Sequence, residues 1–131
     1  MRITVRIALL VALAAVLMTG CMSLQRNMGE ARIRSMMQDL SQLQNSYKVI
    51  QLKLVSAKER VSTVDRERAL VIDAGIVGAN NTFIGRVREY QSGQHKSRLW
   101  ESVVLMYGQL TERVVSGMRE LRKIMMRNQV L

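Results

Sequence analysis

The feature that most constrains this chain is an apolar repeat running through its first half. Apolar residues recur there at steps of three and four: Ile33, Met36, Leu40, Leu43, Tyr47, Ile50, Leu54, Ala57, Val61, Val64 and Val71. Only Arg68 interrupts the series. A 3.5-residue repeat of this length marks a coiled-coil seam, because the ordinary helical period of 3.6 residues would drift off one stripe. The repeat predicts a long helix over about 31–73, whose apolar stripe must be covered by another element.

A second apolar series predicts a returning helix over about 97–128. Its members are Trp100, Val104, Tyr107, Thr111, Val114, Met118, Leu121, Met125 and Asn128, flanked by Val103, Leu110, Gly117 and Ile124. The resulting face is wide enough to contact two neighbours. If the chain reverses near Asn80 and Asn81, Leu40 faces Leu121 and Tyr47 faces Val114. We therefore predict an all-α fold, a long antiparallel helical hairpin that forms a coiled-coil-like bundle.

Residues 74–96, between the two predicted helices, contain half of the chain's eight glycines. Glycine in a helix interior costs about 1 kcal/mol relative to alanine. Gly75 or Gly78 is therefore expected to end the first helix, and the two asparagines to form a turn. A short helix is expected from Thr82 through Tyr90.

The candidate partner-binding residues are Phe83, Arg86, Arg88 and Tyr90, in this middle segment. Aromatic side chains and arginine dominate the energetics of protein interfaces, so these four residues could form an exposed docking tip. The alternative is a connector whose apolar residues plug the end of the bundle. Composition alone does not choose between the two interpretations.

The N-terminus carries the features of an export signal. Arg2 and Arg6 precede an apolar run of twelve residues, Ile7 to Met18, and the small residues Thr19 and Gly20 follow. Crossing a bilayer takes about 20 apolar residues, whereas twelve helical residues cover only about 18 Å. A basic start, a short apolar run and small residues at its end are typical of a secretory signal peptide.

The motif Leu-Met-Thr-Gly-Cys at residues 17–21 resembles the lipobox of bacterial lipoproteins, although leucine is commoner than Met18 at its position. The resemblance implies cleavage between Gly20 and Cys21, with a diacylglyceryl thioether and an N-acyl chain on Cys21. It divides the chain into a signal peptide over 1–20, a lipidated tether over 21–32 and a helical domain over 33–131. Alternatives are an ordinary secretory signal cut nearby, and an uncleaved anchor with a buried cysteine.

The resemblance also implies a location. Asp after the lipidated cysteine keeps such proteins in the inner membrane, and this chain has Met22 there. We therefore expect a lipid anchor at the periplasmic face of the outer membrane, or at the outer face of the plasma membrane in a Gram-positive cell. Two or three acyl chains would hold the protein firmly, since each buried methylene contributes about 0.8 kcal/mol.

Residues that carry chemistry are sparse. Cys21 is the only cysteine and His95 the only histidine, so neither a disulfide within the chain nor a metal site built from Cys and His is expected. The chain has neither a GxSxG elbow nor a GK[ST] phosphate loop, and its acids are scattered. We expect no enzymatic activity, and no cofactor besides the lipids on Cys21.

The charge balance indicates anionic neighbours. The chain has 20 Lys+Arg and 10 Asp+Glu, and loss of Arg2 and Arg6 with the signal leaves 18 against 10, a net charge of +8. We expect an interaction subunit of an envelope assembly, such as a secretion, conjugation or export apparatus. Alternatives are a basic module for anionic lipid headgroups or wall polymers, and a homo-oligomeric coiled-coil spacer. Export argues against nucleic acid as a partner, and many of the cations could simply form a solvated face.

Overall fold

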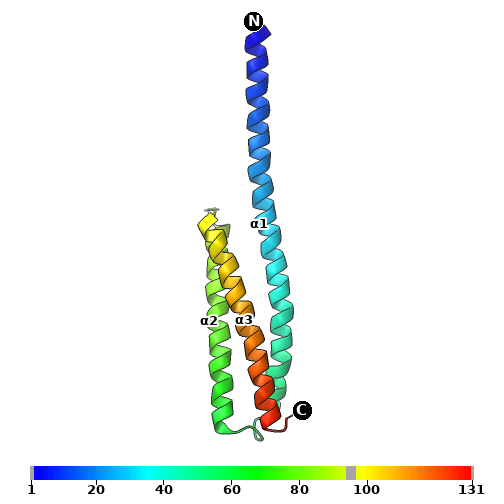
Figure 1. Cartoon of the computed structure of the whole chain (residues 1–131), viewed down its shortest axis with the longest axis vertical. Helices are drawn as coiled ribbons and strands as arrows, with labels where there is room; N and C mark the ends of the chain where they lie inside the picture. Colours follow the sequence, from blue (N-terminus) through cyan, green and yellow to red (C-terminus); the bar gives the residue numbers. More distant parts are fainter. Residues whose placement is uncertain (1, 94–96, 131) are drawn as a thin grey trace. The chain divides into compact units, whose positions relative to one another are not determined.

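Over the residues that it describes, the computed structural model of the chain contains three helices (Figure 1), α1 (Arg2–Ser56), α2 (Thr63–Gln91) and α3 (Ser97–Arg127). It describes the backbone of residues 2–93 and 97–130 and the side chains of residues 28–93 and 97–130. No strand occurs within those backbone ranges. The predicted all-α class is confirmed.

The chain divides into two compact units, Met1–Ser35 and Met36–Leu131. The second unit holds the C-terminal part of α1 together with α2 and α3, and the packing described below belongs to it. The predicted cleavage and lipidation residues, Gly20 and Cys21, lie outside the side chains that the structure describes. Within the described part, no helix combines the length and the apolar character needed to cross a membrane.

The predicted helix over 31–73 is wrong in its C-terminal bound, because α1 ends at Ser56 and α2 begins at Thr63. Ser62 caps α2: its backbone is extended and its hydroxyl accepts a hydrogen bond from the Asp65 N–H at 3.2 Å. A serine in this position satisfies an N–H that has no partner within the helix. Val61, in the turn between the helices, remains buried, so the apolar repeat continues across a break in the helix.

The predicted connector over 74–96 is instead mostly helix, since α2 passes through Gly75, Gly78 and Asn80 without interruption. Asn80 is an interhelical contact and not part of a turn: its side-chain oxygen accepts a hydrogen bond from the Gln44 amide of α1 at 3.1 Å. The helix ends at Gln91, and Gly93, just beyond its C-cap Ser92, has a φ of 98°, the left-handed conformation that glycine adopts without strain.

The three helices of the second unit run up, down and up, so the predicted pairing of Leu40 with Leu121 is wrong. The Ser62 N–H donates to the Asn128 side-chain oxygen at 3.1 Å, which places the α1–α2 turn beside the C-terminal end of α3. At the opposite end, the rings of Tyr90 and Trp100 lie 5.3 Å apart. Helices α1 and α3 therefore run in the same direction, and α2 is antiparallel to both. The predicted antiparallel pairing of α1 with α3 relied on the apolar heptad repeats that both helices carry. Two such repeats can align equally well in parallel or antiparallel directions.

The core of the second unit is apolar and draws on all three helices. Its helical members are Leu40, Tyr47, Ile50 and Leu54 of α1, Ile76, Phe83, Val87 and Tyr90 of α2, and Val103, Leu110, Val114, Met118, Leu121 and Ile124 of α3. Burying a side chain of this size contributes about 1.5–3 kcal/mol, so this core is the main source of stability.

Polar contacts close the end of the bundle at the α1–α2 turn. We call Ser62, Asp65, Arg127 and Asn128 the polar clasp. The Asp65 carboxylate accepts hydrogen bonds from Arg127 and from the Asn128 amide, both at 2.8 Å. The hydrogen bond from Asn128 is the main cause that holds the pKa of Asp65 below its ordinary value. The clasp joins the start of α2 to the end of α3.

Candidate functional site

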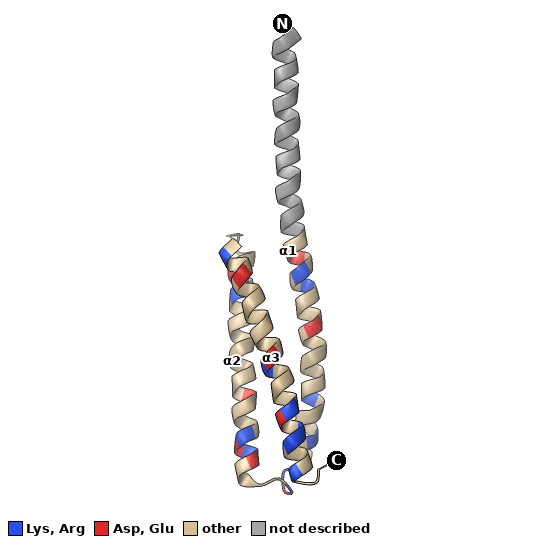
Figure 2. Cartoon of the chain, in the orientation of Figure 1, with Lys and Arg blue, Asp and Glu red and all other residues tan. Residues whose placement is uncertain are grey.

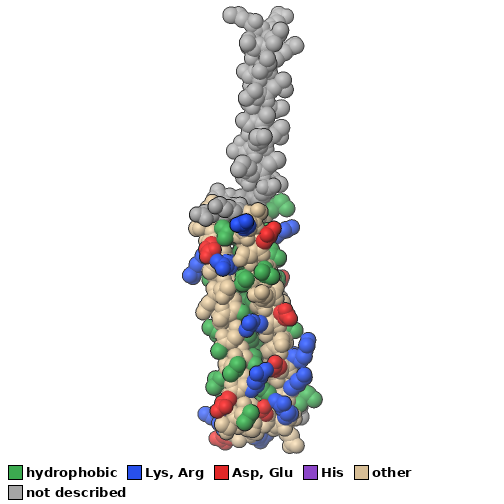
Figure 3. Space-filling view, turned by 60° about the vertical axis from the view of Figure 1, so that its left-hand side comes forward, with side chains coloured by type: hydrophobic (Ala, Val, Ile, Leu, Met, Phe, Trp, Pro, Cys, Tyr) green, Lys and Arg blue, Asp and Glu red, His purple; other side chains and the backbone are tan. Residues whose placement is uncertain are grey.

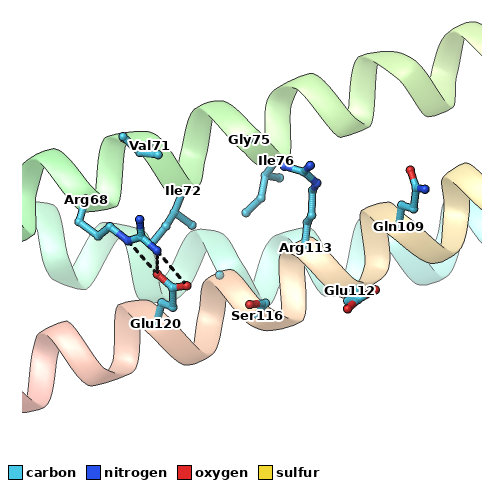
Figure 4. Close-up of a pocket in the computed structure, with 11 residues that line it drawn as sticks. Arg68, Val71, Ile72, Gly75, Ile76, Gln109, Glu112, Arg113, Ser116 and Glu120 are labelled. Atoms are coloured by element: carbon cyan, nitrogen blue, oxygen red, sulfur yellow. Dashed lines mark hydrogen bonds and ion pairs between the residues drawn. The ribbon is translucent and has the colours of Figure 1, made fainter.

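A groove lies between α2 and α3 in the described part of the molecule (Figure 4). Two heptad stripes line it. The α2 stripe consists of Arg68, Val71, Gly75, Gly78 and Thr82, and the α3 stripe of Met106, Gln109, Arg113, Ser116 and Glu120. Two adjoining hollows of about 510 and 370 Å³ make up this α2–α3 groove, and they share Gly75, Gln109 and Arg113. None of the described residues that line them belongs to α1, whose side chains cover a different face of α2.

Small residues keep the groove open on the α2 side. A Cβ atom added to Gly78 would meet no atom within 4 Å, whereas one added to Gly75 would lie 3.1 Å from Nη1 of Arg113. Gly117 of α3 is different, because its Cβ would lie 2.9 Å from the Cγ2 atom of Ile72. Close packing within the protein therefore explains why residue 117 is a glycine, but it does not explain why residue 78 is one. Glycine at such a helical position costs about 1 kcal/mol relative to alanine.

Charged side chains of both helices line the groove. Near one end, the Arg68 guanidinium lies 3.1 Å from the Glu120 carboxylate, in an exposed pair that contributes little to stability. The guanidinium of Arg113 extends across the groove toward Gly75 (Figure 4), and among the described residues it has no hydrogen bond or ion pair. Lys123 and Arg127 surround a further hollow, of about 300 Å³, beyond the Arg68–Glu120 pair.

The excess of cations is concentrated in the C-terminal half of α3. Between residues 113 and 127 this helix carries Arg113, Arg119, Arg122, Lys123 and Arg127 against one acid, Glu120. Figure 2 shows the blue segments gathered along this part of α3. Arg119 and Arg122 do not line the groove, and the charged residues that do are Arg68 and Arg113 with Glu112 and Glu120.

One exposed apolar side chain lines the groove: Val71 is 61% exposed. A space-filling view shows hydrophobic side chains and Lys and Arg side chains along the length of the described part (Figure 3). Exposed apolar surface that adjoins a groove is typical of a protein interaction site.

The structure does not place the four predicted partner-binding residues on an exposed tip. Phe83 is fully buried, with its ring 6.0 Å from that of Tyr107, and Tyr90 is also in the core. Arg86 forms an ion pair with Glu89 on the same helix, and Arg88 is exposed. Phe83 and Tyr90 therefore match the alternative, in which apolar residues of this segment pack into the bundle.

A partly buried group of hydrogen bonds joins α1 to α2. The Tyr47 hydroxyl and the Gln51 amide both donate hydrogen bonds to the Asp73 carboxylate, the latter at 2.6 Å. Burial, followed by the hydrogen bond and the charge of Asp73, raises the pKa of Tyr47, so the phenol remains protonated. A permanently neutral phenol acts here as a structural donor.

The described part of the chain shows no cluster of side chains that could bind a metal ion. Side chains 28–93 and 97–130 include no group of three or more His, Cys, Asp or Glu residues that could hold a metal ion. His95 lies outside the described residues.

Comparison with known proteins gives no relative: the chain matches no family model, no curated protein and no solved structure. The function proposed below is supported by the groove, the charge distribution and the N-terminal motif.

Proposed function

We propose that the protein is a lipid-anchored, non-enzymatic interaction subunit of a cell-envelope assembly, such as a secretion, conjugation or export apparatus. The lipobox-like residues 17–21 support acylation of Cys21, and Met22 supports retention at the periplasmic face of the outer membrane. The lipid holds the chain at the membrane, and the helical domain presents a surface to a partner.

The observation that carries this proposal is the open α2–α3 groove, whose lining includes the exposed side chain of Val71. A folded domain gains nothing from an apolar side chain left in water, whereas covering one contributes roughly 25 cal/mol per Å² of buried apolar surface. A partner bound in the groove would cover Val71, which lines it and is exposed.

Cell fractionation combined with chemical crosslinking in living cells tests the proposal. The unaltered protein is expected in the outer-membrane fraction, crosslinked to a reproducible set of envelope proteins. Cys21→Ser removes the acylated thiol, and the variant is expected to leave the membrane fraction and to lose those crosslinks. Met22→Asp is the matched control, since it keeps the lipid and should move the protein to the inner membrane. Crosslinks that merely mirror the abundance of envelope proteins would contradict the proposal.

A second candidate, a basic module for anionic lipid headgroups or wall polymers, is favoured by one face of α1. Residues 40–58 include no acid, and the exposed side chains of this stretch of α1 include Lys48, Val49, Leu52, Lys53 and Val55. Binding that rests on these lysines should weaken steeply with salt, because exposed charges are screened within about 8 Å at physiological ionic strength. Cosedimentation with phosphatidylglycerol vesicles at low and high salt tests this, and salt-independent binding excludes it.

A further inference from the structure

We propose that α1 and α2 also join into one continuous helix, and that two copies of the chain in this open form exchange their α1 segments to make a domain-swapped dimer. In that dimer, the part of α1 that belongs to the second unit packs on the α2–α3 pair of the other copy instead of its own. The partner is therefore a second copy of this chain. The inference concerns the second unit alone and does not depend on the proposed function.

The turn between α1 and α2 has a sequence that is compatible with helix. Its residues, 57–62, include neither glycine nor proline, and the four from Ala57 to Arg60 are good or moderate helix formers. The Arg60 N–H donates to the Ala57 carbonyl at 2.9 Å, a bond of the tight 3₁₀ type. The reversal of the chain depends on Ser62, whose backbone is extended with a ψ of 153°. Few backbone rotations are therefore needed to continue the helix.

The helical phase of α1 and α2 is the strongest argument. Three pairs of buried residues, each with one member in α1 and one in α2, are separated by 36 positions: Leu40 and Ile76, Tyr47 and Phe83, and Leu54 and Tyr90. Thirty-six residues make about ten turns of an α-helix with 3.6 residues per turn. The core residues of α1 and α2 would therefore share one face if the helix continued through the turn. The closed bundle does not require this agreement, because its turn sets the rotation of α2 independently of that of α1.

The contacts between α1 and α2 also suit an exchange between two copies. Gln44 donates a hydrogen bond to Asn80 at 3.1 Å, and Gln51 donates one to Asp73 at 2.6 Å. Both pairs are centred on Ser62 in the sequence. Two continuous helices that kept these contacts would run antiparallel and cross at a two-fold axis near that residue. The swapped dimer thus re-forms the contacts of the closed chain and changes only the turn.

Contacts of Ser62 favour the closed form. Its hydroxyl accepts from the Asp65 N–H at 3.2 Å, and its own N–H donates to the Asn128 side chain at 3.1 Å. In a continuous helix both N–H groups would bond instead to the carbonyl four residues earlier. The balance between the two forms therefore depends on this serine.

Two substitutions in adjacent positions should shift the balance in opposite directions. Thr63 is the first residue of α2, and Ser62 before it has the extended backbone that proline requires of its neighbour. Proline is favoured at the first position of a helix and breaks a helix interior. Thr63→Pro should therefore keep the closed form and block the open one. Ser62→Ala removes the cap and favours the continuous helix.

Thiol crosslinking in membranes that contain the full, processed chain distinguishes the two forms. Gln44→Cys and Asn80→Cys together place two thiols across the contact between α1 and α2. A short bis-maleimide joins them within one chain in the closed form, and between two chains in the swapped dimer. Denaturing gel electrophoresis separates the two products. Each single-cysteine variant is a control for random collisions and for reaction at Cys21.

The cysteine pair should give both an internally crosslinked monomer and a covalent dimer, and neither single cysteine should give a dimer. Adding Ser62→Ala should raise the ratio of dimer to monomer at least about tenfold, since each dimer contains two of these turns. Adding Thr63→Pro should abolish the dimer and keep the crosslinked monomer. The purified variants should keep the helical circular dichroism. A dimer that persists with Thr63→Pro, a dimer from a single cysteine, or no dimer even with Ser62→Ala would overturn the inference.

Discussion

Two glycines in helix interiors should respond in opposite ways to the same substitution. The Cβ of alanine at position 117 would lie 2.9 Å from Cγ2 of Ile72, 3.1 Å from Cδ1 of Ile76 and 3.4 Å from Cε2 of Tyr47. At position 78 it would meet nothing within 4 Å. The gain in helix propensity is the same at both positions, about 1 kcal/mol, so the difference between the two variants measures the packing at Gly117.

The magnitudes follow from that geometry. Overpacking a core by one methyl group costs about 1–3 kcal/mol, so Gly117→Ala should lower the free energy of unfolding by about 0–2 kcal/mol after the propensity gain. Gly78→Ala should raise it by about 1 kcal/mol. The melting temperatures should differ accordingly, by roughly 4–8 °C per kcal/mol for a domain of this size.

Urea denaturation followed by far-ultraviolet circular dichroism measures both variants against the unaltered protein. The dependence of the unfolding free energy on urea should be unchanged, since neither substitution alters the surface exposed on unfolding. Equal stabilisation by the two substitutions would refute the close packing of α1, α2 and α3 at Gly117.

Three further predictions concern the polar contacts. Ser62→Ala removes the cap of α2 and should lower the free energy of unfolding by about 1 kcal/mol, measured by urea denaturation; no change would contradict the cap. Asp65 has a lowered pKa in the fold, so its stabilisation is complete above its ordinary value of 3.8 and is lost as pH falls through the lowered value. Asp65→Asn should therefore flatten this acid limb in urea midpoints between about pH 6 and 2, and an unchanged limb would contradict the role of Asn128 as its donor. Tyr47→Phe removes one of the two hydrogen-bond donors to the partly buried Asp73 carboxylate. It should lower the free energy of unfolding by about 1–3 kcal/mol, measured by thermal or urea denaturation; a neutral result would contradict that hydrogen bond.

The all-α class and much of the core could be predicted from the sequence, because apolar spacing records which side of a helix is buried. Leu40, Tyr47, Ile50 and Leu54 of the first series are buried in the structure, as that spacing requires. The turn at 57–62 could not be found in this way, since Val61 keeps its place in the repeat and is buried without being helical. The signal for the break was the capping pattern that begins at Ser62, with an acid three residues later.

The prediction that Gly75 or Gly78 ends a helix was wrong because it gave too much weight to the free-energy cost of glycine inside a helix. The core contacts of α2, such as those of Ile76, Phe83 and Tyr90, outweigh about 1 kcal/mol per glycine. These three residues are seven apart, a spacing that predicts a buried stripe and would have removed Phe83 and Tyr90 from the candidate tip.

The α2–α3 groove could not be predicted from the sequence at all. It exists because α1 covers one face of the α2–α3 pair and not the other, which depends on where the chain turns. The approach of Arg113 to Gly75 likewise depends on the antiparallel register of two helices, and residues 38 apart in the chain carry no local signal of it.

Intact-mass spectrometry of the native protein tests the central claim most directly, because every partner proposed above depends on a chain anchored outside the cytoplasm. The account predicts a mass that begins at Cys21 and includes two or three acyl chains. A chain that retains Met1, or one that begins near residue 21 with an unmodified thiol, would contradict it.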